Sequence, residues 1–268
     1  MKGDYDLAMQ DLDQGVQLDP TNAMIYQNRG AAYERMGERE RAIADYDQAI
    51  QLDPKNALSY LNRGSAYESK GDHDRAIRNY DEAIQLDAKN AVAYLNRGDA
   101  YVSKGDYGRA IQDYDQAIQL NPMNADAHSG RGRAYFDQGN FKEAALALSR
   151  ANELEDNAYS IIWHYLARQR GGENGRAELE ADATRLKSKD WPYPVIELYL
   201  GGRSPAEVLS LAGKPEERCE AEFYSGEWHL LHGNRAAAAT ALQAAADMCS
   251  KDFFEYKGAL AELKRLNL

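Results

Sequence analysis

The 268-residue sequence is poor in cysteine and has no long apolar run. Its two cysteines, Cys219 and Cys249, are too few for a disulfide-stapled miniprotein and lack zinc-finger spacing. Apolar residues recur at helical spacing without a run of 18, which argues against a membrane span. The formal charge is −11. Such an acidic chain repels nucleic acid, so we expect protein or peptide partners, basic ones above all.

The sequence also lacks a motif for catalysis or metal binding. No glycine-rich phosphate loop follows a predicted strand, because no segment predicts a strand. His229 and His232 are three residues apart on one predicted helix. His229 falls at a core-facing position, so packing is favoured over metal ligation. We therefore expect no catalytic residue, cofactor or metal, and an enzyme with a site in the second half is the least favoured alternative.

What the sequence does contain is a motif that returns every 34 residues. Asn-Arg-Gly-x-x-Tyr begins at Asn28, Asn62 and Asn96, and an altered copy begins at Gly130. A 34-residue period indicates a helical-repeat solenoid, a fold that mostly binds other proteins. Full repeats, each of two helices, are expected from residues 23, 57, 91 and 125. Residues 2–21 match only a second helix, which suggests that the natural chain begins further upstream.

Small and large residues alternate at fixed phases of this repeat. A mid-helix glycine costs ~1 kcal/mol relative to alanine, so its repetition implies close helix packing. We expect alanines of the second helix to face these glycines, with tyrosines filling the remaining space. The small residues of the first three units are Gly30, Gly64, Gly98, Ala42, Ala76 and Ala110, and the second-helix tyrosines are Tyr46, Tyr80 and Tyr114.

These residues and their spacing resemble the tetratricopeptide repeat (TPR). The resemblance implies an all-α, right-handed TPR solenoid of antiparallel helical hairpins over residues 1–156. One position departs from the family, which usually has leucine there. We expect the arginines at this position to form salt bridges with Asp45, Asp113 or a neighbouring acid. The arginines are Arg29, Arg63, Arg97 and Arg131.

Residues 157–268 predict a divergent helical module that ends in a capping helix over residues 252–266. Aromatic motifs around Trp163, Trp191 and Tyr224 resemble the C-terminal half of NlpI-like bacterial envelope lipoproteins. That resemblance implies an adaptor that docks cell-wall hydrolases and a processing protease. It favours a periplasmic or envelope location, with the cytoplasm as the alternative, although this sequence lacks the lipid-attachment cysteine of that group.

The first helices of stacked hairpins line the concave face of such a solenoid, and one asparagine per repeat recurs there. An asparagine amide can both donate to and accept from a peptide backbone. The row resembles the asparagine ladder with which some TPR proteins hold extended chains. The alternative is that each asparagine merely bonds the neighbouring helix. The predicted groove residues are Asn28, Asn62, Asn96, Met24, Leu58, Leu61, Val92, Leu95 and Asp99.

Cys219 opens the first helix of the last predicted hairpin, and Cys249 closes the second. Because the two helices are antiparallel, both residues lie at the same edge of the hairpin. Their Cα atoms could fall within the ~4.4–6.8 Å that a disulfide needs. The alternative is a pair of reduced, half-buried thiols, as is usual in the cytosol. A bridge would support an exported protein.

The leading interpretation is a protein-interaction adaptor that binds a partner peptide in the concave groove. Its main rival is a structural protein that forms homo-oligomers through the N-terminal helix. That helix has no first helix before it, so its apolar face of Leu7, Leu12 and Val16 is expected to be bare.

Overall fold

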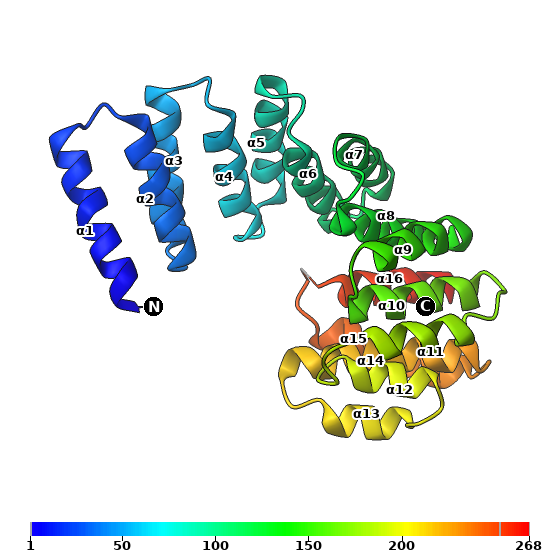
Figure 1. The fold of residues 1–268 in the computed structure, drawn as a ribbon. Helices are drawn as coiled ribbons and strands as arrows, with labels where there is room; N and C mark the ends of the chain where they lie inside the picture. Colours follow the sequence, from blue (N-terminus) through cyan, green and yellow to red (C-terminus); the bar gives the residue numbers. More distant parts are fainter. Residues whose placement is uncertain (1, 252, 268) are drawn as a thin grey trace. The chain divides into compact units, whose positions relative to one another are not determined.

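The computed structural model describes residues 2–251 and 253–267, and within these ranges it holds sixteen helices and no strand (Figure 1). The chain divides into two compact units, one ending at Asn121 and the other starting at Pro122. Among the described residues, no helix is both long and apolar enough to cross a bilayer. The helices of the first unit are α1 (Lys2–Leu18), α2 (Ala23–Arg35), α3 (Arg39–Leu52), α4 (Ala57–Glu68), α5 (His73–Leu86), α6 (Ala91–Ser103) and α7 (Tyr107–Leu120).

The first unit stacks three helical hairpins, α2–α3, α4–α5 and α6–α7, with α1 packed on α2. Helices α2, α4 and α6 begin where the sequence repeats begin. Each is capped by the preceding asparagine, whose side chain accepts from a backbone N–H of the first turn. A glycine with positive φ, such as Gly71 at 74°, turns the chain into the second helix.

The mid-helix glycines meet the tyrosine rings of the second helix. A Cβ built on Gly30, Gly64 or Gly98 would lie 2.6–2.8 Å from a ring carbon of Tyr46, Tyr80 or Tyr114. The close approach is as predicted, but the closest neighbour is a ring rather than the alanine that we expected. The three tyrosines are fully buried. A side chain at any of these glycines would therefore have to displace a packed ring.

The predicted arginine ion pairs are present and repeat along the unit. Arg29 donates Nε and Nη2 to the two carboxylate oxygens of Asp45 (2.7 and 2.8 Å), and Arg97 does the same with Asp113 (2.8 and 2.7 Å). Arg63 instead meets the amide oxygen of Asn79 (2.8 Å). Each arginine also reaches back to the second helix of the preceding unit, at Asp13, Asp47 and Asp81. Arginine thus ties three helices together where the family usually has leucine.

The second unit contains the fourth repeat hairpin and the divergent module. This unit is helical as predicted, and Pro194 lies within the first turn of α12. They are α8 (Ala125–Gln138), α9 (Phe141–Leu154), α10 (Ala158–Arg170), α11 (Arg176–Arg185), α12 (Tyr193–Tyr199), α13 (Pro205–Leu211), α14 (Pro215–Leu231), α15 (Arg235–Met248) and α16 (Phe254–Arg265).

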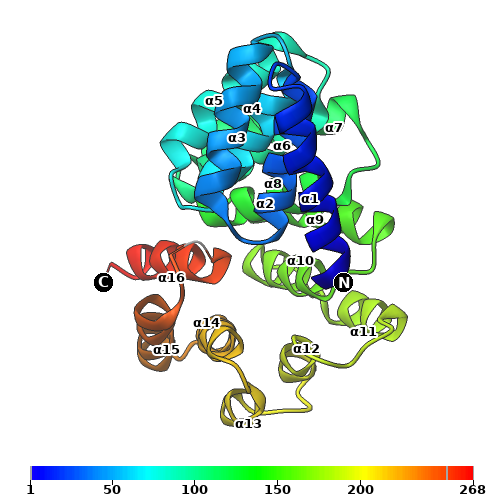
Figure 2. The ribbon, with the colours of Figure 1, turned by 90° about the vertical axis from the view of Figure 1, so that its left-hand side faces the viewer.

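The last helix is buried rather than forming a simple outer cap. In Figure 2, α14 and α15 are seen nearly end-on, while α16 runs across the view next to α15. It also contacts α14 and α8. Arg265 donates to the backbone carbonyls of Phe136 and Asp137, which close the end of α8. Arg170 donates to Glu227 (2.8 Å) and Glu262 (2.9 Å), both at most 1% exposed. These buried ion pairs hold α10, α14 and α16 together.

Candidate functional site

The first helices of the hairpins turn one face away from the second-helix layer. On α2, Gly30 and Tyr33 pack towards α3, so Met24 and Asn28 lie on the opposite side of the helix. Helix α2 contacts α4, and α4 contacts α6. Among the described residues, the contacts between the second helices (α3 with α5, α5 with α7) are less extensive than those between the first helices. The first helices therefore lie on the inner side of the curve, as the sequence predicts. We call their free side the inner face.

The three predicted asparagines occupy equivalent places on the inner face but differ in their surroundings. Asn28 is exposed, and Asn62 and Asn96 are half-buried. The Asn96 side chain lies near the Tyr80 hydroxyl. Within the described residues, no hydrogen bond is found for the amides of Asn28 and Asn62. The neighbouring hairpin therefore offers a partner to Asn96 and leaves the other two amides available.

The predicted apolar stripe is present in part. Met24, Leu58 and Val92 are 66%, 46% and 48% exposed, respectively. Leu95 is half-buried. Leu61 does not belong to the stripe, because it is 8% exposed and packs with Tyr80, Ala93 and Ala100. It lies about a sixth of a turn round α4 from Leu58 and packs against α5 and α6, so it fills the space between two hairpins.

Acidic groups beside this face are held in place by hydroxyl groups. Glu34 accepts from the Tyr46 hydroxyl (3.0 Å) and from the Ser65 hydroxyl (3.0 Å). Asp99, predicted as a groove residue, accepts from the Tyr114 hydroxyl (2.7 Å). Burial and the nearby Glu34 raise the pKa of Tyr46 well above its ordinary value. Tyr46 therefore remains a protonated donor at neutral pH, and the two tyrosine hydroxyls fix the positions of the carboxylates.

Only one of the two carboxylate oxygens of Glu68 accepts hydrogen bonds from the described residues. Its Oε1 lies 2.9 Å from His73 Nδ1 and accepts from the Ser103 hydroxyl (3.3 Å). Its Oε2 is buried and has no partner among the described residues. A buried carboxylate oxygen without a partner is costly, so this position favours a donor from outside.

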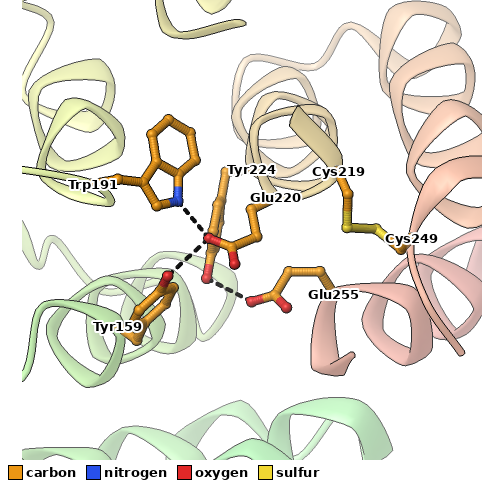
Figure 3. The surroundings of a disulfide bond; sticks show 7 residues. All are labelled: Tyr159, Trp191, Cys219, Glu220, Tyr224, Cys249 and Glu255. Atoms are coloured by element: carbon orange, nitrogen blue, oxygen red, sulfur yellow. Dashed lines mark hydrogen bonds between the residues drawn. A yellow bond between two sulfur atoms is a disulfide. The ribbon is translucent and has the colours of Figure 1, made fainter. Parts of the chain in front are cut away.

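In the second unit, Cys219 and Cys249 are joined (S–S 1.99 Å, Cα–Cα 5.1 Å). Figure 3 shows two carboxylates, those of Glu220 and Glu255, on one side of this link. Glu220 accepts from Trp191 Nε1 (2.6 Å) and from the Tyr159 hydroxyl (3.0 Å), and Glu255 accepts from the Tyr224 hydroxyl (3.0 Å). Burial raises the pKa of Glu220 to about 7. The link joins the start of α14 to the C-cap of α15.

These buried acids are not among the residues predicted from the sequence. A signal was available, since Glu220, Glu227, Glu255 and Glu262 stand at apolar phases of their helices. Nor do the tryptophans frame a ligand site: Trp163 packs against Phe136 (5.0 Å between ring centroids) and Phe223 (5.4 Å). The four acids are held by the guanidinium, hydroxyl and indole donors of their own unit.

Comparison with known proteins identifies the family of the repeats and several solved structures with a similar fold. The family model for the TPR repeat matches residues 2–37, 36–71, 64–105 and 98–139, about half of the chain. The crystal structure of MamA is 30% identical over 58% of this chain and 91% of its own, with a TM-score of 0.55.

Two further structures extend over nearly the whole chain. A tetratricopeptide repeat protein from Parabacteroides merdae is 19% identical over 97% of this chain and 93% of its own (TM-score 0.60). YrrB, described as a TPR protein with an unusual peptide-binding site, is 18% identical over 94% and 97% (TM-score 0.50). At such identities the likeness shows the fold alone. By its repeats and fold, the chain belongs to the tetratricopeptide-repeat proteins, helical scaffolds of protein–protein interaction.

Proposed function

We propose that the first unit binds an extended segment of a partner protein along its inner face. The observation that carries the proposal is the pair of available amides on Asn28 and Asn62, at one phase of successive repeats. Each amide can donate to and accept from a peptide backbone. Exposed Met24, Leu58 and Val92 lie at the same spacing and offer apolar contact to side chains of the segment.

The electrostatics of the inner face favour a basic segment. Glu34, Glu68 and Asp99 are held in fixed positions, and Glu68 keeps one oxygen without a donor. A lysine or arginine of the segment would supply that donor. The formal charge of −11 also steers basic chains towards the protein.

We further propose that the protein acts in the cell envelope. The aromatic motifs that resemble NlpI-like lipoproteins and the pairing of Cys219 with Cys249 support an exported adaptor. In that role the protein would hold a cell-wall hydrolase or a protease through the inner face. A protein found only in the cytosol, with reduced thiols, would remove this part of the proposal and leave the peptide groove standing.

A cross-linking experiment tests the groove. Random 12-residue peptides are displayed on phage and selected against the full chain, and a photo-cross-linking residue then replaces Leu58. The matched control carries it at Gln85, which is exposed on the second helix α5. We expect the selected peptides to cross-link at position 58 and not at 85. Equal cross-linking at both positions would reject the inner face as the binding surface.

A second candidate function rests on Leu7. This residue is 65% exposed on α1, while Leu12 and Val16 are half-buried. A leucine exposed to this extent on an outer helix favours self-association. Leu7→Lys should convert a dimer to a monomer in light scattering if α1 mediates oligomers. An unchanged mass would exclude this role.

A further inference from the structure

A polar pocket in the second unit is separate from the inner face of the first. It lies where the C-terminal end of α9 and the connection to α10 meet α11, with α10 behind them. Its volume is about 390 Å³. That volume lies near the lower end for ligand pockets and suits a single long side chain better than a folded element.

Two buried polar side chains on the wall of this pocket have no partner. His164 of α10 is 9% exposed, lines the pocket and has no hydrogen bond among the described residues. Asn152 of α9 is 6% exposed, and both Oδ1 and Nδ2 are unsatisfied. Buried polar groups are nearly always hydrogen-bonded, so two neighbouring exceptions at one cavity favour a ligand that satisfies them.

The lining of the pocket is strongly acidic. Five carboxylates and one guanidinium, that of Arg185, line it. Two of these acids are paired with arginines outside the lining, Glu178 with Arg168 and Glu153 with Arg150 (2.6 Å). Arg185 is already held by Asp156 (2.7 Å), Asp182 (2.7 Å) and the Asn152 carbonyl (3.3 Å). The five acids are Glu153, Glu155, Asp156, Glu178 and Asp182. The excess negative charge calls for a cation.

The shape and protonation of the site indicate the kind of cation. Among the described residues, no three His, Cys, Asp or Glu side chains converge as metal ligands would. The carboxylates are spread around the pocket, which suits the long side chain of lysine or arginine. Burial lowers the pKa of His164. Its imidazole is therefore neutral at pH 7 and offers a lone pair to an incoming N–H.

We propose that this pocket binds a lysine or arginine side chain of a partner polypeptide. The cationic group lies against Glu178 and Asp182 and donates to the imidazole of His164. Arg185 and Arg168 are the resident cations, and they compete with the incoming one for Asp182 and Glu178, respectively. The TPR chain would then hold its partner at two places, one in each unit.

The test uses the full chain and a labelled peptide, acetyl-Gly-Ser-Arg-Ser-Gly-amide, in fluorescence anisotropy at pH 7.5. Asp182→Asn should weaken binding roughly tenfold, because a charge-assisted hydrogen bond is lost. His164→Phe should weaken it too. Arg185→Gln should strengthen binding, since it frees Asp182. Glu180→Gln is the matched control: Glu180 is an exposed acid of the same helix, paired with Arg176, and its loss should change nothing.

Two further binding measurements test whether the charge is required and whether the cation comes from a peptide or from a small molecule. Replacing arginine by citrulline keeps the shape and removes the charge, and it should abolish binding. Agmatine is a free guanidinium and should bind more weakly than the peptide. Tighter binding of agmatine would assign the pocket to a small molecule and overturn the partner. Binding that survives citrulline, or that falls in Arg185→Gln as in Asp182→Asn, would overturn the site itself.

Discussion

Gly64 and Tyr80 lie in contact across the second hairpin. A Cβ built on Gly64 would stand 2.6 Å from Tyr80 Cε1 and 2.8 Å from Cδ1. Because Tyr80 is buried on all sides, its ring has little room to move. The glycine is therefore a packing requirement of the hairpin.

Gly64→Ala should destabilise the chain by about 1–3 kcal/mol through overpacking, and the loss should spread to adjacent hairpins. Gly108→Ala is the control, because its Cβ would meet only Asp106 Oδ1 at 3.9 Å. That change should be neutral or stabilise by up to ~1 kcal/mol, through helix propensity. Urea unfolding followed by circular dichroism measures both. Equal effects of the two changes would contradict the packing account.

Arg97 and Arg63 offer a matched pair within the arginine series. Arg97→Ala leaves Asp113, whose side chain is 7% exposed, as a buried charge without its partner. Such a loss typically costs about 3–5 kcal/mol. Arg63→Ala leaves the neutral Asn79 and should cost about 1–2 kcal/mol.

The two variants are compared by urea and thermal unfolding. Asn79→Asp in the parent chain should raise stability, because it restores the bidentate pair that Arg63 lacks. Losses of the same size for Arg97→Ala and Arg63→Ala, with no gain from Asn79→Asp, would show that the arginines act through packing alone.

The repeat region was predictable because each of its rules is local and is repeated three times. Small residues mark the close contacts of each hairpin, and the 34-residue period fixes the phase of Asn28 and its equivalents. The predicted acid partners of Arg29 and Arg97 are present, because residues 16 apart face each other across one hairpin, whereas Arg63 meets Asn79 at that position.

What the sequence did not predict depends on contacts between distant or differently oriented residues. Arg170 meets Glu262 across 92 positions, and nothing periodic links them. Leu61 was placed in the groove because it lies one turn from Leu58, yet a small rotation about α4 decides between groove and core. Likewise, the nearby Tyr80 hydroxyl distinguishes Asn96 from two residues that look equivalent in the sequence.

Glu220 should make stability depend on pH. Burial, with the nearby charge of Glu255, raises the pKa of Glu220 from 4.5 to about 7. A carboxyl group whose pKa is higher in the folded state contributes stability below pH 4.5. That contribution is lost as the pH rises through 7. Glu220→Gln removes the effect, so between pH 4.5 and 8 the variant should gain at most about 3 kcal/mol relative to the parent.

Urea unfolding at several pH values measures this difference. Glu216→Gln, at an exposed position of the same helix, is the control for the removal of a carboxylate from α14. A constant difference for Glu220→Gln would mean that Glu220 titrates normally.

Cys219 and Cys249 should form a disulfide in the protein purified without reductant. The separation of 30 residues corresponds to roughly 3–4 kcal/mol in the chain-entropy model. Cys219→Ser with Cys249→Ser should therefore lower the unfolding midpoint. Thiol titration of the unfolded, unreduced chain should find no free thiol. Two free thiols would remove the bridge and most of the case for export.

The central claim, a peptide groove on the inner face, is tested most directly by affinity. Asn28, Asn62 and Asn96 are replaced together by Ala, and a selected peptide is titrated. The control replaces Gln51, Gln85 and Gln119, exposed amides at the same 34-residue spacing on the second helices. Each backbone hydrogen bond is worth ~0.5–1.5 kcal/mol, so the asparagine variant should lose about tenfold or more. The glutamine variant should bind as the parent does. Unchanged affinity of the asparagine variant, with an unchanged helical spectrum, would contradict the account.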